Sequence, residues 1–226
     1  MKFQNRVSVI LAIGIAALGI ATTCYAQDAE GAFTPLFDGK TLAGWEGNQD
    51  FFRIEDDAIV AGTLKRKILH NEFLCTQETF SDFELRLQVK TPVDAINAGI
   101  QFRSRRTPGE SEVVGYQADV GLMAERNIWG SLYDEARRRK MLATPDQTDI
   151  VEAYKPGEWN DYVIRCEGPR IRIWINNFQT VDYTENDSAI ETDGVIALQI
   201  HSGPPAEAWY RNIRIKTMDV IDGSQQ

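Results

Sequence analysis

Residues 194–205 read GVIALQIHSGPP, and the alternation within this stretch predicts a β-strand. Successive strand side chains point to opposite faces, so two sets alternate here: Ile196, Leu198 and Ile200 on one face, and Ala197, Gln199 and His201 on the other. The first set is apolar and is expected to face a core. The strand should end at residues 202–205, because Gly and Pro favour a loop. His201 therefore lies at the end of a strand beside a loop, where binding groups are common.

The first residues of the chain have the pattern of a secretory signal peptide. Lys2 and Arg6 precede an apolar run over residues 7–21, and small side chains at Cys24 and Ala26 suit cleavage before residue 27. A run of roughly 15 apolar residues is shorter than the about 20 needed for a membrane span. We expect a signal peptide over 1–26, export to the periplasm or the exterior, and no membrane span after cleavage. Lipidation of Cys24 is the alternative, although the residue before it fits poorly.

Composition and charge limit the function. The chain has 226 residues and a net charge of -9; loss of Lys2 and Arg6 leaves 22 basic against 33 acidic residues, or -11. Such a surface repels nucleic acid, which we do not expect as a partner. The mature residues, 27–226, are enough for a single domain with its core over about 32–216. Cys75 and Cys166 are compatible with a disulfide in an oxidising compartment or with two separate buried thiols.

Short alternating segments with turn residues between them follow one another along the chain. FELRLQV at 83–89 alternates apolar and polar residues, as does NAGIQFRS at 97–104 and VVGYQADV at 113–120. WNDYVIRCE and IRIWIN are expected to form a hairpin across Gly168-Pro169. Many short strands with little helix predict an all-β fold, an antiparallel β-sandwich. Within the less regular segment 121–153, acidic residues followed by basic ones suggest a short helix over 134–142.

Several strands offer polar side chains to one face. If the parities hold, the shared face carries an arginine, an acid, a histidine and three amides: Gln101, Arg103, Gln117, Asp119, Gln199 and His201. Such groups suit a ligand rich in hydroxyl and carbonyl oxygens, because amides both donate and accept hydrogen bonds. Trp129 and Tyr133 are expected to add a surface for stacking on a sugar. The competing interpretation is an ordinary solvated face, which the absence of Lys and Glu from the set disfavours.

The candidate chemistry is acid–base. His201, oriented by Asp119, could act as general base or acid, because an imidazole titrates near neutral pH. Only one other histidine, His70, occurs in the chain, so a multi-histidine zinc site is excluded. A calcium or other oxygen-ligated divalent metal held by Asp119 and Glu135 stays open. An ordinary glycosidase would need two facing carboxylates, either Asp119 with Glu135 or Asp119 with Glu207.

The motifs LFDGKTLAGW, SDFELRLQVKT, NAGIQFRS, GYQADVG, WGSLYDE, WNDYVIRCEGPRIRIWIN and GVIALQIHSGPP occur in this order over about residues 32–216. Taken together, they resemble the 3-keto-disaccharide hydrolase family. The resemblance implies a concanavalin A-like jelly-roll sandwich. It also implies an exported enzyme that cleaves 3-keto-glycosides, by hydrolysis or by elimination followed by hydration.

That chemistry needs a base near C2 of the sugar, an electrophile at the 3-keto oxygen and an acid at the glycosidic oxygen. We assign the base to His201 or Asp119, the electrophile to Arg103 or a divalent metal, and the acid to Glu135 or Tyr133. Substrate binding is assigned to Gln101, Gln117, Gln199, Trp129, Tyr133 and Asn97. The alternative function is a non-catalytic carbohydrate-binding module on the same sandwich, since fold does not fix function.

Overall fold

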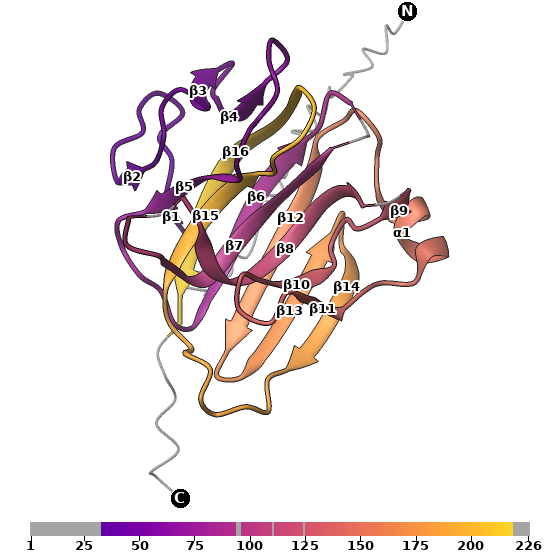
Figure 1. The fold of residues 1–226 in the computed structure, drawn as a ribbon. Helices are drawn as coiled ribbons and strands as arrows, with labels where there is room; N and C mark the ends of the chain where they lie inside the picture. The colour runs from indigo at the N-terminus through magenta and orange to yellow at the C-terminus, as the bar shows by residue number, and fades with distance from the viewer. Residues whose placement is uncertain (1–32, 94–95, 110, 124, 219–226) are drawn as a thin grey trace, which may run out of the picture. The chain divides into compact units, whose positions relative to one another are not determined.

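Two antiparallel β-sheets pack face to face in the structure, a computed structural model (Figure 1). It describes residues 33–93, 96–109, 111–123 and 125–218, so the predicted signal peptide at 1–26 lies outside the described residues. From Ala32 onward the chain forms one compact unit. The all-β prediction is confirmed. Among the described residues, no helix has the length and apolarity that a membrane crossing requires.

The first sheet, named here the β6 sheet, has the order β14-β13-β12-β6-β16-β4-β3, and β1 pairs with β16. Its strands are β1 (Thr34–Pro35), β3 (Phe52–Glu55), β4 (Ala58–Thr63), β6 (Phe83–Lys90), β12 (Asn160–Glu167), β13 (Arg170–Ile175), β14 (Phe178–Thr184) and β16 (Ala206–Thr217). The expected hairpin across Gly168-Pro169 is present, with Cys166 opposite Ile171. Gly168 has a φ of 50°, which suits its place in this tight turn.

The second sheet, named here the β7 sheet, has the order β11-β10-β8-β7-β15-β5-β2, and β9 pairs with β8. Its strands are β2 (Trp45–Glu46), β5 (Glu72–Thr76), β7 (Asn97–Arg106), β8 (Val113–Met123), β9 (Arg126–Asn127), β10 (Leu132–Glu135), β11 (Lys140–Ala143) and β15 (Val195–Ile200). The stretch 194–205 contains β15, a central strand of this sheet, which ends one residue before His201. One helix, α1 (Gln147–Ala153), follows β11 and is capped by Asp146, which accepts a hydrogen bond from the Thr148 N–H.

The core lies between the two sheets, and the alternation along β15 decides which of its residues enter it. Ile196, Leu198 and Ile200 belong to this core together with apolar side chains of β6, β12 and β16. Ala197 belongs instead to a small apolar cluster with Phe73 on the opposite face of the β7 sheet. The predicted assignment of the two faces is therefore confirmed for this strand.

The helix predicted over 134–142 is wrong, because these residues form the hairpin of β10 and β11. Ala136 and Arg139 adopt left-handed backbone conformations, with φ values of 57° and 50°, which a right-handed α-helix through this segment does not allow. The buried Asp134 carboxylate accepts a hydrogen bond from Arg137 at 2.9 Å and also pairs with Arg138. The charge pattern thus reflects a tight turn that gathers arginines around one acid, while β10 pairs with β8.

The two cysteines of the described residues are separate and buried. Cys75 lies on β5 in the β7 sheet, Cys166 lies on β12 in the β6 sheet, and both are free thiols. Burial raises the pKa of each thiol to about 12. Of the two arrangements left open by the sequence, the structure therefore has two inert thiols and no bridge between these residues.

Candidate active site

A hollow of about 100 Å³ opens on the outer face of the β7 sheet, near the end of β15. It is lined by Asn97, Gln117, Asp119, Met123, Ile128, Tyr133, Glu135 and His201. All of these except Met123 and Ile128 are among the predicted site residues. Polar side chains from β7, β8, β10 and the end of β15 therefore meet in one place.

Strand pairing brings these side chains together. Gln117 of β8 lies opposite Tyr133 of β10, and Asp119 lies opposite Gly99 of β7. The missing side chain at Gly99 is needed here, because a Cβ would lie 2.5 Å from the Gln117 Cδ. The Gln117 amide can therefore lie across β7 and donate a 2.8 Å hydrogen bond from Nε2 to Asp119 Oδ1.

Asp119 is the most perturbed carboxyl group in the hollow. Its residue is only 3% exposed. Burial raises the pKa of its carboxyl to about 8, with a smaller contribution from the negative charge of Glu135, while the hydrogen bond from Gln117 acts in the opposite direction. Asp119 is therefore mainly neutral at pH 7 and can donate a proton or a hydrogen bond, which an ordinary aspartate cannot do.

Tyr133 and Glu135 line the same hollow as Asp119, and the pKa values of both are also shifted. Burial, followed by repulsion from Glu112, raises the pKa of the Glu135 carboxyl, and the His201 side chain opposes this shift. Burial and the neighbouring carboxylates also raise the pKa of the Tyr133 hydroxyl. Ionisable groups with shifted pKa values that gather in a hollow are typical of functional sites.

The position of His201 is set by its backbone and by one ring nitrogen. Its N–H donates a 3.0 Å hydrogen bond to the Asn97 carbonyl, which extends the pairing of β15 and β7 by one residue. Its Nδ1 lies 2.7 Å from the Ser202 carbonyl oxygen. A carbonyl can only accept, so in the neutral ring Nδ1 carries the hydrogen and Nε2 keeps its lone pair. That tautomer leaves Nε2 as a base.

Arg103 does not face the hollow, so the expectation that it shares this surface is wrong. Its Nε donates to the Ser81 carbonyl at 2.8 Å and its Nη1 to the Gly168 carbonyl at 2.7 Å. Its Nη2 pairs with Asp82 Oδ1 at 2.8 Å. The cause is a β-bulge in β7 after Phe102, where Arg103 has a φ of 47° and the side-chain alternation is interrupted.

Trp129 does not face the hollow either, so the prediction that it stacks on a sugar is wrong. Its side chain is buried in the core and stacks on Tyr154, with ring centroids 4.5 Å apart. It therefore offers no surface to a sugar. Glu207, named as one alternative carboxylate partner of Asp119, lies on β16 in the β6 sheet and pairs with Arg53 at 3.0 Å. Of the two carboxylate pairs, only Asp119 and Glu135 line the hollow.

Gln101 and Gln199 lie on the predicted face but do not line the hollow. Gln101 donates from Nε2 to the Val113 carbonyl at 3.3 Å and to Gln117 Oε1 at 3.4 Å. Gln199 is fully buried, and neither its amide nitrogen nor its amide oxygen has a partner among the described residues. Their assignment to substrate binding stays a prediction.

Two residues of the hollow were missed, and both are apolar. Met123 has the same strand parity as Gln117 and Asp119, so continuing the alternation of β8 by two more positions would have found it. Ile128 lies in the segment between β9 and β10 and carries no such signal. The two side chains give the hollow an apolar wall, which helps to keep water from the acidic groups.

The divalent metal that the sequence left open is not supported by the donor set. Within the residues that the structure describes, no three His, Cys, Asp or Glu side chains form a group that could hold a metal ion. Asp119 and Glu135 therefore do not fit a calcium site, and no step of the chemistry below uses one.

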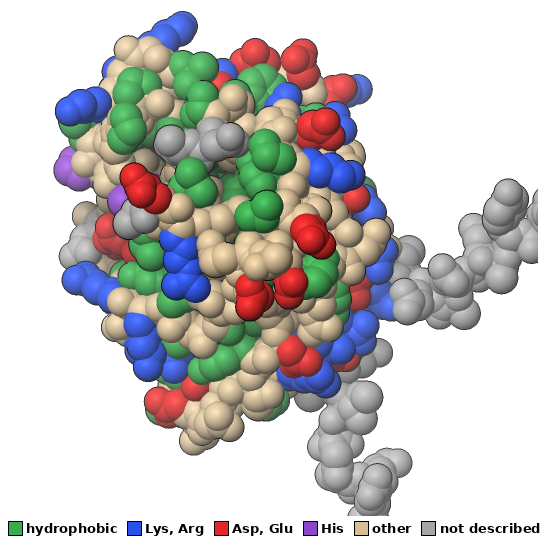
Figure 2. Space-filling view, turned by 90° about the vertical axis from the view of Figure 1, so that its right-hand side faces the viewer, with side chains coloured by type: hydrophobic (Ala, Val, Ile, Leu, Met, Phe, Trp, Pro, Cys, Tyr) green, Lys and Arg blue, Asp and Glu red, His purple; other side chains and the backbone are tan. Residues whose placement is uncertain are grey.

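On the face drawn in Figure 2, acidic and basic side chains are interspersed and do not gather into a basic surface.

The fold is an antiparallel jelly-roll sandwich of the concanavalin A-like class, with a hollow lined by ionisable side chains on one sheet. The chain belongs to the family described as the 3-keto-α-glucoside-1,2-lyase-like domain, whose model matches residues 32–216. The family predicted from the sequence motifs is therefore confirmed. No curated protein matches the chain.

Three solved structures with similar folds carry names that refer to carbohydrates. A candidate glycosyl hydrolase from Parabacteroides distasonis has a TM-score of 0.62 and 16% identity, covering 83% of this chain and 94% of that one. Carbohydrate-binding module CBM66 from Bacillus subtilis has a TM-score of 0.55 and 13% identity, with coverages of 77% and 96%. The lumenal domain of VIP36, bound to Ca²⁺ and Man3GlcNAc, has a TM-score of 0.55 and 11% identity, with coverages of 81% and 87%. At these identities the likeness shows the fold alone.

Proposed function

We propose that this protein is an exported enzyme that cleaves the glycosidic bond of 3-keto-glycosides by elimination in the hollow around His201 and Asp119. The supporting observation is one imidazole with a free Nε2 beside a carboxyl group that burial keeps largely protonated. A base and a neutral acid in contact with the same small volume suit the removal of a proton next to a ketone. The family description agrees with this reaction class.

The reaction proceeds as follows. His201 Nε2 removes the proton from C2, which the C3 ketone makes acidic. The electron pair forms the C2–C3 double bond of an enolate, and the Asp119 carboxyl donates a hydrogen bond to the enolate oxygen. The enolate then returns its electrons to form the C1–C2 double bond, while the C1–O bond breaks. Glu135 or Tyr133 supplies a proton to the departing oxygen, and the products are an unsaturated keto-sugar and the released alcohol.

A substrate with deuterium at C2 distinguishes elimination from direct hydrolysis. We expect the intact protein to cleave a 3-keto-disaccharide and to turn over the C2-deuterated form several times more slowly, because the C2–H bond breaks. The measurement is kcat for both isotopologues, followed by analysis of the products. Cleavage with no isotope effect would contradict elimination in favour of hydrolysis. If the protein bound the sugar but cleaved no 3-keto-glycoside, it would instead be a carbohydrate-binding module.

The pH dependence tests the role of Asp119. Because burial raises its pKa to about 8, turnover should fall as the pH rises through about 8 and the carboxyl loses the hydrogen that it donates. Asp119→Asn keeps an N–H donor but cannot titrate, so we expect kcat to be roughly 10- to 100-fold lower and the fall near pH 8 to vanish. The readout is kcat from pH 6 to pH 10, with the exposed Asp149→Asn as the matched control.

The same variant has an equilibrium signature that does not depend on turnover. The folded pKa of Asp119, about 8, lies above the ordinary aspartate pKa of 3.8, so the folded state binds this proton more tightly than the unfolded state. Its stabilising contribution is complete below about pH 4 and is lost as the pH rises to about 8. The free energy of unfolding of the intact protein, relative to Asp119→Asn, should therefore fall over this interval. A flat difference in denaturant titrations would refute the raised pKa.

A further inference from the structure

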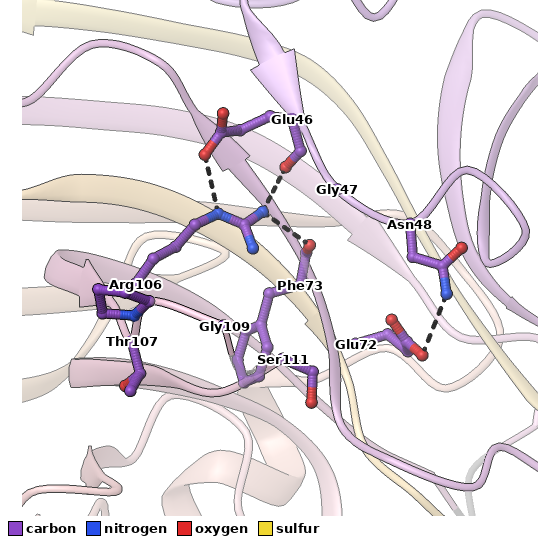
Figure 3. A pocket seen from close by; sticks show the side chains of 10 residues that line it. Glu46, Gly47, Asn48, Glu72, Phe73, Arg106, Thr107, Gly109 and Ser111 are labelled. Carbon is purple, nitrogen blue, oxygen red and sulfur yellow. Dashed lines mark hydrogen bonds and ion pairs between the residues drawn. The ribbon is translucent and has the colours of Figure 1, made fainter.

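A second and larger cleft lies at the β2–β5 edge of the same sheet. It has a volume of about 570 Å³ and runs between the residues after β2, the start of β5 and the segment that joins β7 to β8. Its polar lining comes from Glu46, Asn48, Glu72, Arg106, Thr107 and Ser111 (Figure 3). None of these residues lines the hollow around His201, so the cleft is separate from the candidate active site.

The cleft presents fixed hydrogen-bonding groups. Arg106 pairs through Nε with Glu46 Oε1 at 2.9 Å and donates from Nη2 to the Glu46 carbonyl at 2.6 Å. Away from this pair, Asn48 Nδ2 donates to Glu72 Oε1 at 3.3 Å (Figure 3). The other oxygen of the Glu72 carboxylate makes no hydrogen bond to the described residues, and this side chain is largely buried. A ligand hydroxyl could therefore bind a carboxylate oxygen whose position the protein already holds.

Strand register connects this cleft to the active site. Phe73, Gln199, Gly99 and Asp119 are successive partners across β5, β15, β7 and β8. Three strand spacings separate Phe73 from Asp119, or about 14 Å. Between them lies Gln199, whose buried amide has no partner among the described residues, and the adjacent Gln101 Oε1 has none either. Both glutamine side chains are fully buried, so they face no ligand, and only the strand register relates the cleft to the hollow.

We propose that the cleft is a second sugar subsite, so that the substrate is a neutral oligosaccharide longer than a disaccharide. Its reacting 3-keto sugar occupies the hollow, and sugar units further along the same chain occupy the cleft; this inference rests on the proposed function. The lining contains two carboxylates and one guanidinium, in a chain of net charge -9. This balance disfavours uronate or sulfated chains and leaves hydroxyl groups as the best partners.

Binding measurements with unoxidised α-linked gluco-oligosaccharides test the subsite without requiring turnover. We expect Kd, measured by calorimetry on the full mature chain, to tighten by about tenfold or more from disaccharide to tetrasaccharide, the effect of one or two hydrogen bonds to charged groups. The side chain introduced by Ser111→Trp fills the cleft, so this variant should bind the disaccharide and the tetrasaccharide with equal affinity. Asn48→Ala, which removes an amide without adding bulk, should lose part of the gain. Ser188→Trp, at an exposed turn outside the cleft, is the matched control and should keep the full gain.

The outcomes separate this inference from the proposed function. A Kd independent of chain length in the intact protein, or a length effect that survives Ser111→Trp, overturns the subsite even if 3-keto-glycosides are cleaved. A length effect that Ser111→Trp and Asn48→Ala both reduce supports the subsite, even if no variant cleaves a 3-keto-glycoside and the proposed reaction fails. If Asn48→Ala retains the full gain while Ser111→Trp abolishes it, the cleft is still the binding site and the amide is not one of its contacts.

Discussion

Replacing His201 by alanine is expected to lower kcat for cleavage of a 3-keto-glycoside by about 10²- to 10⁴-fold, the usual contribution of a positioned general base. The physical reason is the ring tautomer: Nδ1 is 2.7 Å from the Ser202 carbonyl, which leaves Nε2 free to take the C2 proton. KM should change much less than kcat, because proton removal belongs to the transition state. Steady-state kinetics on a 3-keto-disaccharide give both constants.

The chain supplies its own control for this experiment. His70, the only other histidine, is exposed and lies outside the hollow, so His70→Ala should retain normal kcat and KM. Added imidazole should restore part of the activity of His201→Ala by entering the space of the lost ring. Undiminished cleavage by His201→Ala would remove His201 from the mechanism.

Replacing Arg103 by methionine should destabilise the protein by about 3–5 kcal/mol, the cost of breaking a buried ion pair. The guanidinium holds two backbone carbonyls and Asp82, and its side chain is 1% exposed. A loss of this size is a large part of the 5–15 kcal/mol that a domain typically has. Denaturant titration gives the free energy of unfolding. Arg103→Lys, which keeps the charge but not the planar guanidinium, should lose less free energy of unfolding and remain folded.

A neighbouring arginine is the matched control. Arg105 also pairs with an acid, Glu191, but both side chains are more than half exposed, so Arg105→Met should change the free energy of unfolding by no more than about 1 kcal/mol. Folded Arg103→Lys should keep the kcat of the intact protein, since Arg103 does not reach the hollow. A hundredfold loss of kcat in the folded variant would return Arg103 to the catalytic chemistry.

The bulge that redirects Arg103 shows where local patterns fail. NAGIQFRS reads as an unbroken alternation, and Gln101 follows it. Alternation cannot report that β7 shifts register after Phe102, because the shift depends on strands far away in the sequence. Gly194, before β15, is one such partner: a Cβ there would lie 2.4 Å from the Ser104 nitrogen, so the bulged segment can approach only a residue without a side chain.

The acid–base residues divide in the same way. Gln117, Asp119 and His201 could be placed on a common face from sequence because each lies in a regular strand or directly after one. Tyr133 and Glu135 were named only from their neighbourhood in the chain, and the pairing of β10 with β8 was needed to bring them to the hollow. Trp129, two residues after the end of β9, packs in the core against Tyr154 and Tyr162. No sequence pattern near Trp129 indicates these contacts.

The sequence by itself determined the all-β fold, the family, and the strand faces on which an amide, an aspartate and a histidine lie. These depend on alternation and turn chemistry, which are local properties of the chain. Only the tertiary structure decided which polar residues reach the hollow, which arginine is structural, and that a second cleft lies at the edge of the same sheet. Those outcomes depend on strand register, bulges and burial, and these are set by partners that the chain brings together only on folding.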